Sequence, residues 1–101
     1  MSEDDSNTIK AQPPETLTIV FHEPLVLGNL TYGELTFREL TAGQYKVMAK
    51  QAGVDATLWG LGMSAGCAPK IIEMMPVSLF AEAERFVSGF FKGVRPEDSD
   101  A

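Results

Sequence analysis

Few residues of this 101-residue chain could perform acid–base or nucleophilic chemistry, and their spacing does not bring them together. The only histidine, His22, could act as a base and the only cysteine, Cys67, as a nucleophile, but about 45 residues separate them. We interpret His22 as a structural side chain at a strand end and Cys67 as a packed thiol. Glu82 and Glu84 fall on the polar flank of the last predicted helix, where carboxylates serve solubility. The sequence therefore predicts a protein that is not an enzyme.

Metal and cofactor sites are not indicated either. A single cysteine excludes an internal disulfide, and together with a single histidine it excludes the usual structural zinc sites. The glycine-rich run over residues 60–66 could be taken for a phosphate-binding loop. Its third glycine comes one residue too late for the dinucleotide fingerprint, however, and no Gly-Lys-Ser/Thr follows it. We interpret the run as part of a helix whose glycines let another helix approach, either within the fold or in a partner.

Charge is concentrated at the two ends of the chain. The net charge is −6, and residues 1–15 hold four acids against one lysine, while residues 95–101 hold three acids against one arginine. We expect residues 1–15 to form a disordered acidic arm, residues 16–94 a single folded domain, and residues 95–101 an acidic disordered tail. The ends would keep an otherwise adhesive domain soluble.

The sequence also argues against nucleic-acid binding, membrane insertion and secretion. The basic footprint of a nucleic-acid binder is missing, and no stretch is long and apolar enough to predict a membrane span. The first ten residues are acidic, unlike a signal peptide. We therefore expect a cytoplasmic protein that binds neither nucleic acid nor membrane.

A β-hairpin is predicted at the start of the folded domain. Residues 17–21 and 30–37 are rich in β-branched and aromatic side chains, and Gly28-Asn29 between them is a two-residue turn signal. We predict a bulge or bend at Glu23-Pro24. One extra residue in the first strand there would pair Phe21 with Leu35 and Ile19 with Phe37.

Helices are predicted over the remainder. Thr41 to Gln44 has the form of a capping box, and Gly53 is predicted to end that helix. Asp55 is predicted to cap a second helix running to about Gly66, followed by a short helical turn over residues 70–75 and a long helix over residues 77–91. The fold class is therefore α+β, with an N-terminal β-hairpin followed by three to four α-helices in a single small domain.

The last predicted helix carries the clearest functional signal. Its apolar side chains, three phenylalanines among them, fall on one broad stripe, and five methionines occur in the chain. Methionine adapts to irregular apolar surfaces, so this surplus indicates a protein that covers hydrophobic surface of a partner, although ordinary core filling explains many of these residues as well. The candidate client-binding residues are Trp59, Met63, Met74, Met75, Phe80 and Phe91.

The order of these segments resembles a known family. An apolar strand leads to Pro24 and a glycine-containing turn, and a helical second half ends with Phe90-Phe91. Between them stands Tyr32-Gly33-Glu34-Leu35-Thr36-Phe37-Arg38-Glu39-Leu40-Thr41-Ala42-Gly43-Gln44. Over residues 16–92 the chain resembles the tail assembly chaperones of contractile-tailed phages and Mu-like prophages. It departs from them at Leu40, where many relatives have proline, and in its glycine-rich middle.

The resemblance implies a cytoplasmic protein of the bacterial host that binds the long, helical tape-measure protein during tail assembly and is not part of the finished virion. It also implies a longer frameshifted product that recruits the tail tube protein. The alternative is a structural tail protein, or another oligomer-forming protein, whose surplus apolar face joins identical subunits.

Overall fold

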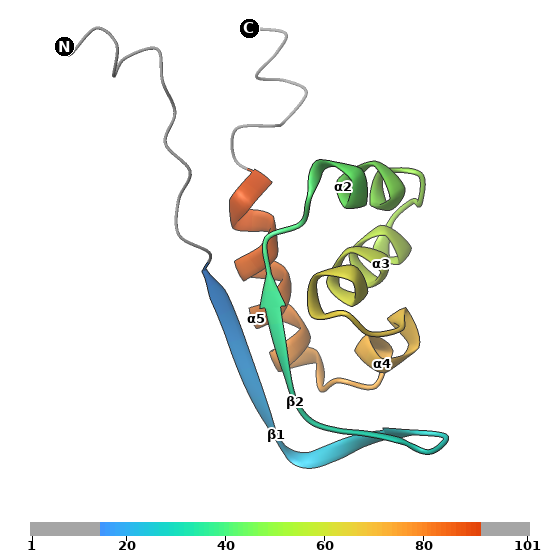
Figure 1. Cartoon of the computed structure of the whole chain (residues 1–101), viewed down its shortest axis with the longest axis vertical. Helices are drawn as coiled ribbons and strands as arrows, with labels where there is room; N and C mark the ends of the chain where they lie inside the picture. Colours follow the sequence, from blue (N-terminus) through green and yellow to red (C-terminus); the bar gives the residue numbers. More distant parts are fainter. Residues whose placement is uncertain (1–14, 92–101) are drawn as a thin grey trace, which may run out of the picture.

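A β-hairpin and four α-helices follow one another in a computed structural model that describes residues 15–91 (Figure 1). The elements are β1 (Thr16–Leu27), β2 (Leu30–Arg38), α2 (Ala42–Ala49), α3 (Val54–Ala65), α4 (Pro69–Glu73), α5 (Val77–Ser88) and a final 3-10 turn, η1 (Gly89–Phe91). The predicted α+β class is confirmed. The predicted acidic tail and nearly all of the predicted acidic arm lie outside the described residues.

The hairpin turns at Gly28, whose φ of 63° favours glycine, and Leu27 pairs directly with Leu30. The predicted irregularity near Pro24 is confirmed, but its predicted size is wrong. Four residues of β1 between Val20 and Leu25 stand opposite Gly33 alone, so β1 carries three extra residues rather than one. Pro24 cannot donate to the ladder and Gly33 packs no side chain, so pairing opens there. Beyond this point the hairpin bends, and its tip passes below α4 (Figure 1).

The difference between the predicted and the observed bulge changes which residues pair across the hairpin, but not which face of the sheet each side chain occupies. Ile19 pairs with Leu35 and Leu17 pairs with Phe37, in place of the predicted Phe21–Leu35 and Ile19–Phe37 pairs. The shift between the predicted and observed registers is two residues, which returns every side chain to the same face of the sheet. The apolar face was therefore predicted correctly from a wrong register.

The capping box at the start of α2 is confirmed. The Thr41 hydroxyl accepts from the Gln44 amide at 3.1 Å, and the Gln44 side chain accepts from the Thr41 amide at 3.0 Å. The predicted end at Gly53 is wrong, because α2 ends at Ala49. Gly53, with a φ of 61°, is instead the N-cap of α3, and Asp55 lies inside the first turn of α3 rather than capping it.

Glycine and proline set the remaining boundaries. The helix α3 ends at Gly66 in the left-handed conformation, with the Cys67 amide donating to the Gly62 carbonyl at 2.9 Å, as in a Schellman motif. Pro69 begins α4, and Pro76 is the N-cap of α5. The predicted last helix over residues 77–91 is confirmed in extent, with its final turn tightened to 3-10 geometry.

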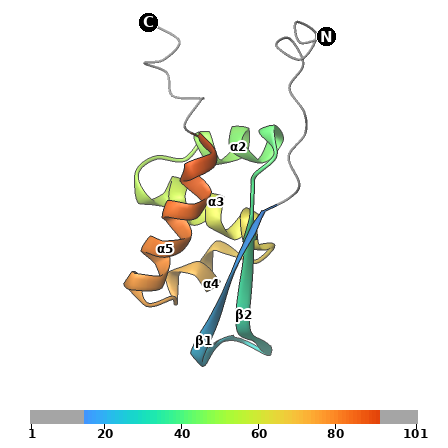
Figure 2. The same cartoon turned by 90° about the vertical axis from the view of Figure 1, so that its left-hand side faces the viewer.

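The core lies between the inner face of the hairpin and the helices. The two views show α5 along one face of the hairpin, and α3 packed between α2 and α4 (Figures 1 and 2). The buried apolar side chains come from the strands, from α3 to α5 and from the connections between elements. They are Ile19, Phe21, Leu25, Leu35, Phe37, Leu40, Leu61, Ile71, Ile72, Met75, Ala83 and Val87.

One buried hydroxyl ties the sheet to the central helix. Ser64 of α3 is 1% exposed, and its Oγ accepts from the Arg38 amide at 2.8 Å and donates to the Arg38 carbonyl at 2.6 Å. Both backbone groups of Arg38 therefore point away from β1 and toward α3.

Within residues 15–91 no helix is long and apolar enough to cross a membrane.

Candidate functional site

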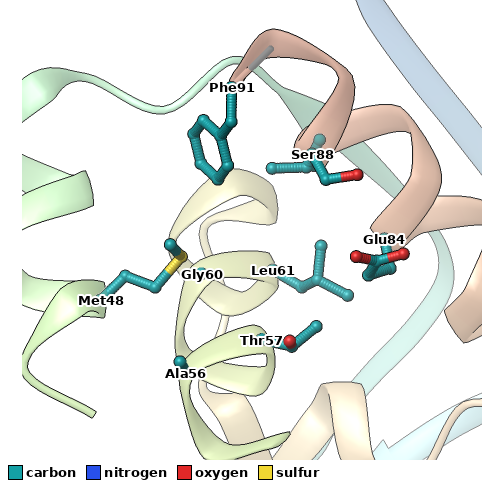
Figure 3. Close-up of a pocket in the computed structure, with 9 residues that line it drawn as sticks. Met48, Ala56, Thr57, Gly60, Leu61, Glu84, Ser88 and Phe91 are labelled. Carbon is teal, nitrogen blue, oxygen red and sulfur yellow. The ribbon is translucent and has the colours of Figure 1, made fainter. Parts of the chain in front are cut away.

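A groove with a mostly apolar lining opens between α2, α3 and α5. It encloses about 190 Å³, and we call it the Phe91 groove. Figure 3 shows Met48 reaching over Gly60 from one side, with Phe91 and Glu84 on the other. The residues that line it are Met48, Ala56, Thr57, Gly60, Leu61, Glu84, Val87, Ser88 and Phe91.

The Phe91 ring is held in place by a second aromatic ring. It packs edge-to-face on Tyr45 of α2, with ring centroids 5.1 Å apart, so η1 is anchored to α2. Glu84 and Ser88 add polar groups on the α5 side of the groove. Neither ion pair found among residues 15–91 involves Glu84, because they join Lys70 to Glu73 and Arg85 to Glu82.

A second, wider groove lies where α3, α4 and α5 begin or end. It encloses about 490 Å³, and we call it the Phe80 groove. Asp55 and Glu73 bring carboxylates to it, and Val77, with 80% of its surface exposed, stands at the start of α5 beside it. Its lining consists of Asp55, Leu58, Ile72, Glu73, Met75, Val77 and Phe80.

The six candidate residues do not form one continuous site. Trp59 and Met74 are exposed, at 41% and 38%, whereas Met63, Phe80 and Phe91 are half-buried against the core. Met75 is only 7% exposed, so the folded chain presents little of it to a partner.

The grooves separate these residues further. Met75 and Phe80 line the Phe80 groove, Phe91 lines the Phe91 groove, and Trp59 and Met63 line neither. Sequence reasoning missed Val77, which lies off the apolar stripe of α5 and follows a proline. Other large apolar side chains exposed outside both grooves are Val20, Val26, Leu30, Val47 and Val54.

The glycine-rich run packs against the chain itself. A Cβ on Gly60 would lie 2.5 Å from the Met48 sulfur, and one on Gly62 would lie 2.8 Å from the carbonyl oxygen of Cys67. These glycines therefore admit α2 and the connection between α3 and α4 rather than a phosphate or a partner helix. Of the two interpretations left open by the sequence, packing within the fold is the one observed.

The side chains that could take part in catalysis or metal binding lie far apart in the structure. His22 is exposed on β1, and Cys67 is half-buried in the connection between α3 and α4, where desolvation raises the pKa of its thiol. A raised pKa makes a thiol less nucleophilic at neutral pH because less of it is thiolate. Within residues 15–91 no three His, Cys, Asp or Glu side chains gather closely enough to hold a metal ion.

The chain matches no protein-family model, no curated protein and no solved structure.

Proposed function

We propose that this protein is a phage tail assembly chaperone that binds the hydrophobic, helical tape-measure protein and keeps it soluble. The proposal rests on the likeness of residues 32–44 to that family. One structural observation supports it: the strongly exposed Val77 lines the Phe80 groove, and the Phe91 groove has a mostly apolar lining. A chaperone of this kind acts in the cytoplasm of the bacterial host, uses no cofactor and catalyses no reaction.

The exposed apolar surface supplies the attraction. Val77 and Trp59 each present an apolar side chain to solvent, and a client that covered them would remove this surface from water. Burial contributes about 25 cal/mol per Å² without requiring a strict client sequence. Each groove has room for apolar side chains projecting from one face of a client helix, as in other helix-in-groove complexes.

The acidic side chains in the two grooves favour client helices that carry positive charge. Glu84 lies in the Phe91 groove, and Asp55 and Glu73 in the Phe80 groove, with no lysine or arginine in either lining. Client helices with lysine or arginine next to their apolar stripe therefore suit these grooves best. The tail tube protein remains a further partner, reached through a longer frameshifted product.

Co-expression with the tape-measure protein tests the proposal. The variant Trp59→Asp/Val77→Asp places two charges on the exposed apolar surface. Val77 is the first residue of α5, where a carboxylate is favourable, so the fold should tolerate that half of the change. The control Val26→Asp/Val47→Asp adds the same charge at exposed apolar positions of β1 and α2 that the proposed client-binding surface does not include.

The wild type and the control should keep the tape-measure protein in the soluble fraction, and the Trp59→Asp/Val77→Asp variant should lose it to the pellet. Circular dichroism of each purified variant would establish that it is folded. A wild-type chain that leaves the client insoluble would refute the chaperone role. A folded Trp59→Asp/Val77→Asp variant that still protects the client would refute the proposed client-binding surface.

The alternative function, a structural or self-associating tail protein, is favoured by one observation. No described element covers the outer edge of β1 (Figures 1 and 2). A large assembly whose mass is unchanged by tape-measure fragments would support this alternative over the chaperone.

A further inference from the structure

The two edges of the hairpin are treated differently by the fold. The outer edge of β2 lies against α3, where Ser64 bonds both backbone groups of Arg38. The outer edge of β1 has no such cover from any element within residues 15–91 (Figures 1 and 2). Unpaired edges are templates for pairing with another strand, and proteins usually protect them.

The bonds of Arg38 establish which groups of β1 are free. Arg38 is opposite Thr16, and because its amide and carbonyl point away from β1, this is a non-hydrogen-bonded pair. Pair types alternate along an antiparallel ladder, so Leu17 and Ile19 bond to β2, while Thr16, Thr18 and Val20 direct their amides and carbonyls outward. The 2.8 Å contact between the Thr18 and Thr36 hydroxyls fits a closely spaced, non-hydrogen-bonded pair.

Lysine, other charged side chains and proline, which commonly protect a strand edge, are missing from the part of β1 that precedes the bulge. Residues 16–22 contain no lysine, no proline and no charged side chain, and the first charge and the first proline after them are Glu23 and Pro24. Val20 is 69% exposed on the outer face. Two copies can therefore approach along this segment without like-charge repulsion, despite the net charge of −6.

We propose that β1 pairs antiparallel with β1 of a second copy of this chain, which would join two hairpins into one four-stranded sheet. Charge and bulge positions exclude two of the possible registers. A two-fold axis at Ile19 would set Glu15 opposite Glu23 of the second copy, and an axis at Val20 would set Thr16 opposite Pro24. An axis at Thr18 avoids both conflicts and pairs Thr16 with Val20 of the second copy.

Val20→Lys is the decisive variant. A lysine there blocks strand addition, yet within one chain it lies opposite Glu34 and forms a favourable cross-strand pair, so the hairpin itself should be preserved. Val26→Lys is the matched control, since Val26 is also an exposed valine of β1 but lies beyond the bulge. Thr18→Pro removes an outward amide that the hairpin does not use and serves as a second, independent variant.

Light scattering during gel filtration, over about a hundredfold range of concentration, provides the readout. The wild type and Val26→Lys should approach twice the 11.0 kDa mass of the chain as concentration rises, and Val20→Lys and Thr18→Pro should stay monomeric. A wild type that is monomeric throughout, or a folded Val20→Lys that dimerises as the wild type does, would overturn the proposal.

Two further measurements test whether a second copy of the chain covers the edge of β1 and whether the two strands pair about Thr18. Hydrogen exchange at the Thr18 and Val20 amides should slow as concentration rises, whereas protection independent of concentration would show that the edge is covered by the same chain instead. Thr18→Cys should form a disulfide-linked dimer on oxidation, because Thr18 faces its own counterpart, and His22→Cys should not. The reverse result would refute the Thr18 register.

Discussion

Replacing Ser64 by alanine should destabilise the fold far more than the loss of one small hydroxyl would suggest. Ser64 is 1% exposed and bonds both the amide and the carbonyl of Arg38. Alanine leaves both backbone groups without these partners, at about 1–3 kcal/mol for each group that stays dry. Partial access of water to Arg38 lowers this cost, and the better helix propensity of alanine offsets up to about 0.5 kcal/mol. The expected net loss is about 2–3 kcal/mol.

Urea and thermal denaturation would measure this loss. For a domain of this size each kcal/mol lowers Tm by about 4–8 °C, so Ser64→Ala should melt roughly 8–24 °C below the wild type. Ser78→Ala, at an exposed position of α5, makes the same chemical change and should shift Tm by no more than a degree or two, roughly. Equal stability of the two variants would refute the claim that this hydroxyl ties β2 to α3.

Three further predictions concern packing, capping and the thiol. Gly62→Ala should lower the free energy of unfolding by about 1–2 kcal/mol because the new Cβ meets the Cys67 backbone. Gly60→Ala should be neutral or stabilising because the Met48 side chain can move aside. Urea denaturation measures both variants, and equal stabilities would contradict this interpretation of the packing. Thr41→Ala should cost about 1 kcal/mol through loss of the capping box, and an unchanged Tm would contradict this. Alkylation of the native Cys67 thiol should rise with pH at a higher midpoint than in the urea-unfolded chain, because burial raises its pKa; equal midpoints would contradict this.

Local signals were the predictable part of the fold. The capping box of Thr41 and Gln44, the turn at Gly28 and the prolines before α4 and α5 act over a few residues, so their sequence identifies them. Gly53 shows the limit of such signals. A glycine between two helices can end one or begin the next, and only the observed φ of 61° at the N-cap of α3 decides between them.

Tertiary features were not predictable from spacing. Pro24 and Gly33 locate the bulge, but the number of extra residues depends on how the bent tip packs against the helices. Met74 and Met75 are neighbours with the same side chain, yet one is 38% and the other 7% exposed, because the chain that leaves α4 turns only Met75 toward the core. The grooves likewise combine side chains from three helices, and no local pattern brings those together.

Tryptophan emission gives the most direct test of apolar shielding. Trp59 is the only tryptophan of the chain and is 41% exposed, so its emission reports on one known position of the surface. Adding a soluble helical fragment of the tape-measure protein that itself lacks tryptophan should shift this emission to shorter wavelength, and the shift should saturate as the fragment is titrated. A fragment that does not bind, or that binds without changing the emission of Trp59, would contradict the account.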